Sequence, residues 1–194
     1  MRIVRSCAYF SLAVLAFILA TPSSARADGF LSGLIGYNFG GDAGCPTLQN
    51  CDDKRANLGV SAGSIGVIGF EEELAYAKDF FGKSSAGGSS VLTLMSNLLI
   101  APGFGPVHPY VLGGAGLLRA RTDFTPSALI LNASDNQFAW DVGGGVMVFA
   151  GHVGVRGDIR HFHSFQETTG LLGFLATGDK LNFGRASGAI VFKF

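Results

Sequence analysis

Charged side chains at alternating positions are the clearest chemical feature of this chain. Asp141 precedes a run of glycines, and Arg156, Asp158 and Arg160 follow at every second position. Residues two apart in an extended strand point to the same face, so this spacing gathers acids and guanidinium groups on one side. Away from water such groups must pair with one another, and the pattern therefore predicts a network of ion pairs.

The next residues bring together two histidines and a serine, the side chains of nucleophilic and metal sites. Ser164 directly follows His163, and neighbouring residues of a strand face opposite sides. A serine nucleophile needs hydrogen-bond contact with its base, which this spacing does not provide. His161 and His163 alone are too few ligands for a metal. We therefore predict interfacial residues at a rim and no catalytic, metal or cofactor site.

A two-stranded hairpin over residues 136–164 positions these groups. Its second face is apolar and includes Trp140, Val142 and Ile159. If Ala150-Gly151 forms a two-residue loop, the register follows, although Ala-Gly is not among the strongest hairpin dipeptides. That register pairs Asp141 with Arg160, Gly143 with Asp158, and Gly145 with Arg156.

Composition separates a soluble protein from a membrane protein here. Only 14% of the residues are charged, 48% are hydrophobic and 29 are glycine. An ordinary soluble domain has about 25% charged residues, so this chain has too few to cover a water-facing surface. Clustered Lys and Arg are also missing, which excludes a nucleic-acid-binding surface.

The N-terminus has the features of a secretory signal peptide. Arg2 and Arg5 precede an apolar run at residues 7–20, and Ala25-Arg26-Ala27 fits a cleavage site. We expect residues 1–27 to be removed, leaving one domain over residues 28–194. The alternative is an uncleaved membrane helix, but such a helix needs about 20 apolar residues and this run is shorter. Cleavage removes three of 14 basic residues and none of 14 acidic ones, giving a net charge of −3.

Two cysteines remain beyond the signal peptide. Cys45 and Cys51 lie in a segment rich in Pro, Asn and Asp, and in an oxidising compartment they favour a loop disulfide. The alternative is a metal site, but the two thiols would supply only half of the ligands of a tetrahedral metal ion.

Eight runs of about ten residues, separated by turn-rich stretches, predict an all-β chain. The runs cover residues 30–40, 55–66, 68–81, 90–100, 107–120, 136–149, 152–164 and 182–194. Odd-numbered connections are long and even-numbered ones are tight, as in an outer-membrane barrel with long loops outside and short turns in the periplasm. We therefore predict an eight-stranded antiparallel up-and-down transmembrane β-barrel.

Alternation then assigns further side chains to the lumen. Glu71, Glu73, Arg119 and Arg185 are expected to join the four charges of the hairpin. Because Arg119 is assigned to the lumen, alternation turns Tyr110, Leu112 and Leu118 of the fifth run toward lipid. The third run would turn Phe80 and Glu72 to lipid too, and Glu72 then has to lie near the periplasmic rim, where a charge costs least. Eight strands leave a lumen that side chains can fill, so a closed ionic plug is favoured over a conducting pore.

Several segments resemble a known family. The residues that carry the likeness are the signal peptide, Pro109 to Gly116 after a Pro/Gly-rich turn, Trp140 to Gly145, and the terminal Phe194. They are similar to small eight-stranded bacterial outer-membrane barrels, which include the membrane domain of outer membrane protein A and the opacity-type proteins. The alternating Ile190, Phe192 and Phe194 resemble the signal that the outer-membrane assembly machinery reads.

The resemblance implies location and partners more clearly than activity. It implies a bacterial outer-membrane protein in contact with lipid, lipopolysaccharide and, during biogenesis, the barrel assembly machinery. We expect a non-enzymatic structural or surface-interaction role with a closed polar lumen. One alternative is a narrow porin-like channel or a conduit for small apolar molecules. Another is a lipid A-modifying enzyme, but a related deacylase class has its His and Ser two residues apart, which His163 and Ser164 do not reproduce.

Overall fold

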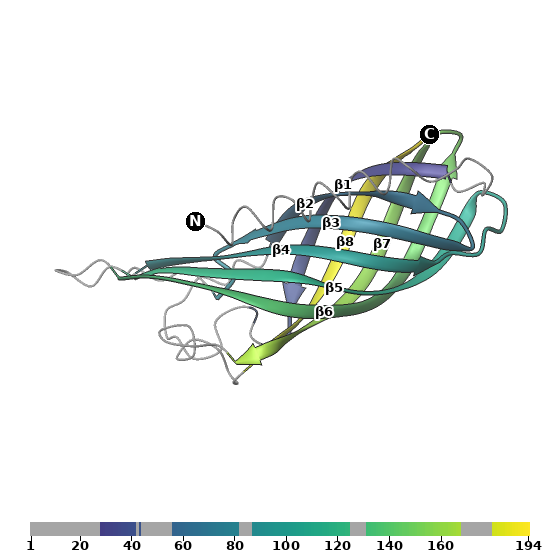
Figure 1. Ribbon diagram of the computed structural model, residues 1–194. Coiled ribbons are helices and arrows are strands. Elements are labelled where there is room, and N and C mark those ends of the chain that lie inside the picture. The colour runs from purple at the N-terminus through teal and green to yellow at the C-terminus, as the bar shows by residue number, and fades with distance from the viewer. Residues whose placement is uncertain (1–27, 42, 44–55, 82–86, 125–130, 168–179) are drawn as a thin grey trace, which may run out of the picture.

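Eight antiparallel strands form a closed barrel (Figure 1). The computed structural model describes residues 28–41, 43, 56–81, 87–124, 131–167 and 180–194. The strands are β1 (Asp28–Phe39), β2 (Ala56–Ile65), β3 (Ile68–Lys78), β4 (Gly87–Ile100), β5 (Val107–Phe124), β6 (Leu131–Ala150), β7 (Val153–Glu167) and β8 (Lys180–Lys193). Each pairs with its neighbours in the chain, and β1 closes against β8, which confirms the predicted architecture. No helix within these ranges is long and apolar enough to cross a membrane.

The two ends of the barrel differ in their connections, as predicted. Residues 66–67, 101–106 and 151–152 make the tight turns at one end, where β1 begins and β8 ends. There the backbones of Gly29 and Phe194 exchange two hydrogen bonds of 2.9 Å. The other four connections lie at the opposite end. The β5–β6 hairpin is more regular than predicted, because strand continues through most of residues 121–135, and it projects beyond β1 and β8 (Figure 1).

The register of the β6–β7 hairpin differs from the predicted one by two residues. Ala150 pairs with Val153, so the loop is Gly151-His152. Gly151 has φ of 68°, and a positive φ at the first loop position suits a type II′ hairpin turn, for which glycine is favoured. A shift of two residues keeps every side chain on its predicted face and changes only the partners. The observed pairs are Asp141 with Phe162, Gly143 with Arg160, Gly145 with Asp158, and Met147 with Arg156.

An apolar outer wall surrounds the barrel. Trp140, Val142 and Ile159 lie on it as predicted, and Glu72 lies on it half-buried. Ser96 on β4 donates a 2.7 Å hydrogen bond to the Glu72 carboxylate. Glu72 is four residues into β3, which places it about 13 Å along the strand from the tight-turn end. The large outward apolar residues include Leu31, Ile35, Leu58, Val60, Leu74, Leu94, Leu98, Val111, Val155, Ile190 and Phe192.

Two face assignments made from the sequence were wrong. On β5, Tyr110, Leu112 and Leu118 point into the lumen, whereas Arg119 is exposed on the outer wall. Both faces of this strand carry apolar residues, so alternation alone does not identify the inner one. Phe80 is also inside, because the strand ends at Lys78 and Asp79 takes φ of 55°, which interrupts the alternation.

Two apolar clusters occupy the ends of the lumen. The cluster near the tight turns contains Phe30, Ile65, Leu99, Ala101, Tyr110, Leu112, Met147, Phe149 and Val191. The cluster near the long connections contains Ala43, Ala77, Phe80, Phe81, Val91, Met95, Leu118, Ala120, Ala139, Phe162, Leu181 and Phe183. The charged residues lie between them.

Candidate functional site

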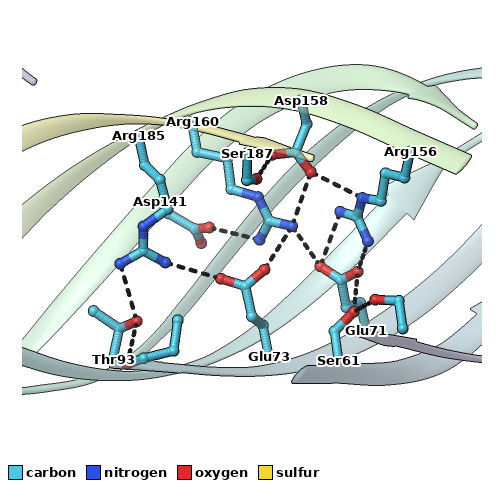
Figure 2. A network of polar contacts seen from close by, with 12 residues as sticks. Ser61, Glu71, Glu73, Thr93, Asp141, Arg156, Asp158, Arg160, Arg185 and Ser187 are labelled. Atoms are coloured by element: carbon cyan, nitrogen blue, oxygen red, sulfur yellow. Dashed lines mark hydrogen bonds and ion pairs between the residues drawn. The ribbon is translucent and has the colours of Figure 1, made fainter. Parts of the chain in front are cut away.

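Buried charges from four strands meet in the middle of the lumen (Figure 2). β3 contributes Glu71 and Glu73, and β6 contributes Asp141. Each points inward because it occupies the inner position of its alternating strand. The partners come from β7 and β8 and approach Glu71 and Glu73 from the facing side of the lumen, where Asp141 also lies (Figure 2). They are Arg156, Asp158, Arg160 and Arg185, and none of the seven is more than 7% exposed.

Arg160 is the centre of this ion network. Its Nη2 atom lies 2.9 Å from a carboxylate oxygen of Glu71 and 2.9 Å from one of Glu73. The same nitrogen is 3.3 Å from Asp158, and Nη1 is 3.6 Å from Asp141. A single guanidinium group, 1% exposed, therefore faces four carboxylates.

Glycine makes room for this central arginine. Gly143 lies opposite Arg160 in the β6–β7 pair. A Cβ atom at Gly143 would lie 2.8 Å from Cγ of Arg160 and 2.5 Å from the carbonyl oxygen of Ile159. No real Cβ fits at such distances, so the missing side chain allows the arginine to cross the lumen.

Arg156 links the network to the apolar cluster near the tight turns. Its Nη1 atom donates to Glu71, and Nε lies 2.8 Å from Asp158. The Tyr110 hydroxyl donates to Asp158 at 2.6 Å, and the Arg156 guanidinium lies 4.8 Å from the centre of the tyrosine ring. The other oxygen of Asp158 accepts a hydrogen bond from Ser187. Tyr110 was missed from the sequence because alternation was taken to place this face of β5 against lipid.

Arg185 makes the equivalent link to the cluster near the long connections. It lies 3.1 Å from Glu73 and donates to Asn38 at 3.1 Å and to Thr93 at 3.3 Å. Its guanidinium group also lies 4.5 Å from the centre of the Phe162 ring, which is cation–π distance. The charged layer is thus continuous with both apolar layers.

Asn97 and Ser61 complete the contacts of the acids. With its amide turned to satisfy both neighbours, Asn97 donates to Asp141 at 2.7 Å and accepts from Arg160 at 3.2 Å. Ser61 donates to Glu71 at 3.2 Å. Buried ions are tolerated when they are paired and their remaining hydrogen-bonding atoms have partners, and most of these atoms do.

The network contains four acids and three arginines, because Arg119 does not belong to it. When all seven groups are ionised, the layer has a net charge of −1. The sequence predicted a balanced set of four acids and four bases. Arg119 instead borders a depression on the outer wall together with Arg121.

The His-Ser segment does not form a catalytic pair. Ser164 is fully buried, and its Oγ atom accepts a hydrogen bond from the backbone N–H of Leu181. His161 and His163 are on the outer face, where the rings lie 6.0 and 5.7 Å from that of Trp140. Within the described part of the chain, no group of three His, Cys, Asp or Glu residues is placed to hold a metal ion.

The other residues singled out from the sequence lie elsewhere. Ile190, Phe192 and Phe194 are on the outer wall, with exposed fractions of 56%, 52% and 80%. Recognition of these residues by the assembly machinery stays a prediction. Cys45, Cys51 and the signal peptide at residues 1–27 lie outside the described residues, so the disulfide and the cleavage site also stay predictions.

The comparison with protein families agrees with this geometry. Residues 10–194 match the family described as outer membrane protein beta-barrel domain. The chain belongs to this family. It is therefore a bacterial outer-membrane protein, and in barrels of this kind the end with the long connections is the extracellular one. No curated protein matches the sequence significantly.

Solved structures of small outer-membrane barrels share the fold. Neisserial surface protein A is 15% identical with a TM-score of 0.64, and the match covers 86% of this chain and 97% of that one. A major outer membrane protein of Thermus thermophilus is 14% identical with a TM-score of 0.60, covering 87% and 100%. The attachment invasion locus protein of Yersinia pestis, in complex with the heparin analogue sucrose octasulfate, is 13% identical with a TM-score of 0.56, covering 87% and 99%. At these identities the likeness concerns the fold alone.

Proposed function

We propose that this protein is a non-enzymatic outer-membrane barrel with a closed lumen, and that it acts as a structural or surface-interaction protein through its extracellular end. The observation that carries the proposal is Arg160, which is 1% exposed in the middle of the lumen and faces four carboxylates. A guanidinium group held in this way occupies the path that a solute would take.

The layers on either side of the ion network support closure. An ion that passed through would have to cross buried apolar side chains before and after the charged layer, for example Phe30 and Phe162. An eight-stranded barrel has an interior that side chains can fill, so its width does not imply a water-filled channel. The competing function is a narrow channel or a conduit for small apolar molecules.

Conductance distinguishes these two functions. We expect the purified barrel to give no steady single-channel current in planar lipid bilayers, with insertion checked by the difference in gel mobility between heated and unheated samples. Arg160→Ala should also give no steady current, because both apolar clusters remain. Steady currents from the wild-type protein would contradict a closed lumen and favour the channel.

The surface role takes support from analogy with one structural neighbour. The Yersinia pestis protein is named for attachment, and its crystal structure is a complex with a heparin analogue. We infer that the extracellular end of this barrel also serves contact with other molecules. Binding of cells that express the barrel to immobilised heparin, compared with cells that carry an empty vector, tests one such ligand class.

Lipid analysis tests the enzymatic alternative. With Ser164 buried and His163 on the opposite face, we expect mass spectra of lipid A to be unchanged when the barrel is overexpressed. Loss of an acyl chain from lipid A would reject the non-enzymatic assignment.

A further inference from the structure

The outer wall carries a polar depression near its extracellular end. It has a volume of about 150 Å³ and is lined by Tyr76 of β3, Ser90 and Leu92 of β4, and Arg119 and Arg121 of β5. It lies outside the barrel, because each of these residues occupies an outward position of its strand. The ion network of the lumen does not contribute to it.

Two arginines line this depression, and a third basic residue is close to it in the sheet. Arg119 and Arg121 are two residues apart on one face of β5, so their Cα atoms are about 7 Å apart. Ser90 is the strand partner of Arg121 and also of Lys78 on β3, which is exposed. The positive charges therefore lie on β3 and β5, on the two sides of Ser90 of β4.

These cations differ from the arginines of the lumen in the ion pairs that the structure describes. Arg156, Arg160 and Arg185 each pair with at least one carboxylate. Across the residues that the structure describes, no ion pair joins Lys78, Arg119 or Arg121 to an acid.

The surrounding residues place the depression at the edge of the apolar belt. On the tight-turn side of it, Leu74, Leu94 and Leu117 are outward and apolar. Tyr76 is 48% exposed, and aromatic residues of this kind mark the membrane–water interface of barrels. On the other side, β5 continues to Phe124. The arginines are therefore at the level of the head groups in the extracellular leaflet.

We propose that Arg119 and Arg121 bind a phosphate group of lipid A, the phosphorylated glycolipid of the outer leaflet. Guanidinium groups bind phosphate through two parallel charge-assisted hydrogen bonds, and two arginines at this spacing can hold one phosphate from both sides. Ser90 supplies a further hydroxyl donor, and Leu92 and Tyr76 offer apolar surface to the lipid beside its head group. This lipid site is independent of whether the lumen conducts.

Native mass spectrometry of the folded barrel in a neutral detergent tests the site. Three probes are added in turn: lipid A with two phosphates, the same lipid after dephosphorylation, and inorganic phosphate. The test variant is R119Q/R121Q, and R119K/R121K keeps the charge but removes the guanidinium geometry. The matched control is K193Q, which removes a basic residue at the opposite end of the barrel. Gel mobility of unheated samples verifies that each variant is folded.

We expect the wild type and K193Q to retain bisphosphorylated lipid A equally. Binding by R119Q/R121Q should fall by about tenfold or more, since each lost charge-assisted contact is worth at least that factor, with R119K/R121K in between. Equal retention by the wild type and folded R119Q/R121Q would overturn the proposal, as would equal binding of the dephosphorylated lipid. Complete displacement of lipid A by millimolar inorganic phosphate would also overturn it, because the site would then recognise the free anion.

Discussion

Replacing Arg160 with methionine is the most direct test of the ion network. Methionine keeps an unbranched, apolar side chain but removes the guanidinium group that faces Glu71, Glu73, Asp141 and Asp158. Four acids would then remain in the lumen with two arginines. The appropriate comparison is Arg119→Met, which removes the same group from the outer wall, where no carboxylate among the described residues forms an ion pair with it.

The expected loss of stability follows from burial. Removing one partner of a buried ion pair costs about 3–5 kcal/mol, because the other charge is left uncompensated. An exposed side chain without such a partner changes the free energy of unfolding by about 0.5 kcal/mol or less. With a urea dependence of about 2 kcal/mol per molar, the unfolding midpoint of R160M should fall by roughly 1.5–2.5 M, and that of R119M by about 0.25 M or less.

The barrel contains its own reporter for this measurement. Trp140 is the only tryptophan of the sequence, and it lies on the outer wall beside His161 and His163. Its fluorescence should therefore change when the barrel leaves the lipid. Urea titrations in phospholipid vesicles, approached from the folded and the unfolded side, give the midpoints of both variants.

Equal midpoints for R160M and R119M would refute the reasoning, and so would a more stable R160M. The pairwise term can be isolated with Glu73→Gln, since Glu73 contacts Arg160 at 2.9 Å. R160M should cost less in the E73Q background, because one fewer carboxylate is left unpaired. Additive effects of the two substitutions would show that this contact contributes nothing.

Two further predictions concern glycine and the lipid-facing acid. Gly143→Ala should lower the free energy of unfolding by about 1–3 kcal/mol, because the added Cβ would overlap Arg160 and the Ile159 carbonyl. Gly157→Ala is the control and should have little effect, since a Cβ at Gly157 meets nothing within 4 Å. Similar urea midpoints for the two variants would contradict the tight fit at Gly143. Glu72→Gln should raise the midpoint in the same assay by an amount equivalent to about 1 kcal/mol, since it removes a charge from the outer wall and keeps an acceptor for Ser96. A lower midpoint for E72Q would show that the charge itself stabilises the wall.

Much of the fold was predictable because strand alternation and loop length are both visible in the sequence. Alternation placed Glu71, Glu73 and Asp141 on the inner face, and none of these assignments depends on the register. The partners within the β6–β7 hairpin were not predictable to the same degree, since a shift of two residues leaves every face unchanged. Turn chemistry was the better guide, because a type II′ turn favours glycine at its first loop position and so favours the loop Gly151-His152, in agreement with the positive φ of Gly151.

The strand β5 shows where alternation stops being informative. Leu112 and Leu118 on one face and Val111 and Leu117 on the other are equally apolar, so the only guide was the charge of Arg119, which was assigned to the lumen. An arginine at the head-group level of the outer wall is also stable, because its charge remains in a polar layer. The neighbouring strands decide between the two orientations, since the lumen around Leu118 is lined by apolar side chains.

The ion network also bears on how the barrel is assembled. Its contacts join Glu71 and Glu73 of β3 to arginines that are 85 to 112 residues later in the chain. A sheet that has formed only from β1 to β6 therefore holds both acids without any of the three lumen arginines, at a cost that grows as water is excluded. The last two strands carry all three of the lumen arginines. Closing of the sheet therefore also supplies the arginines that pair with the buried acids.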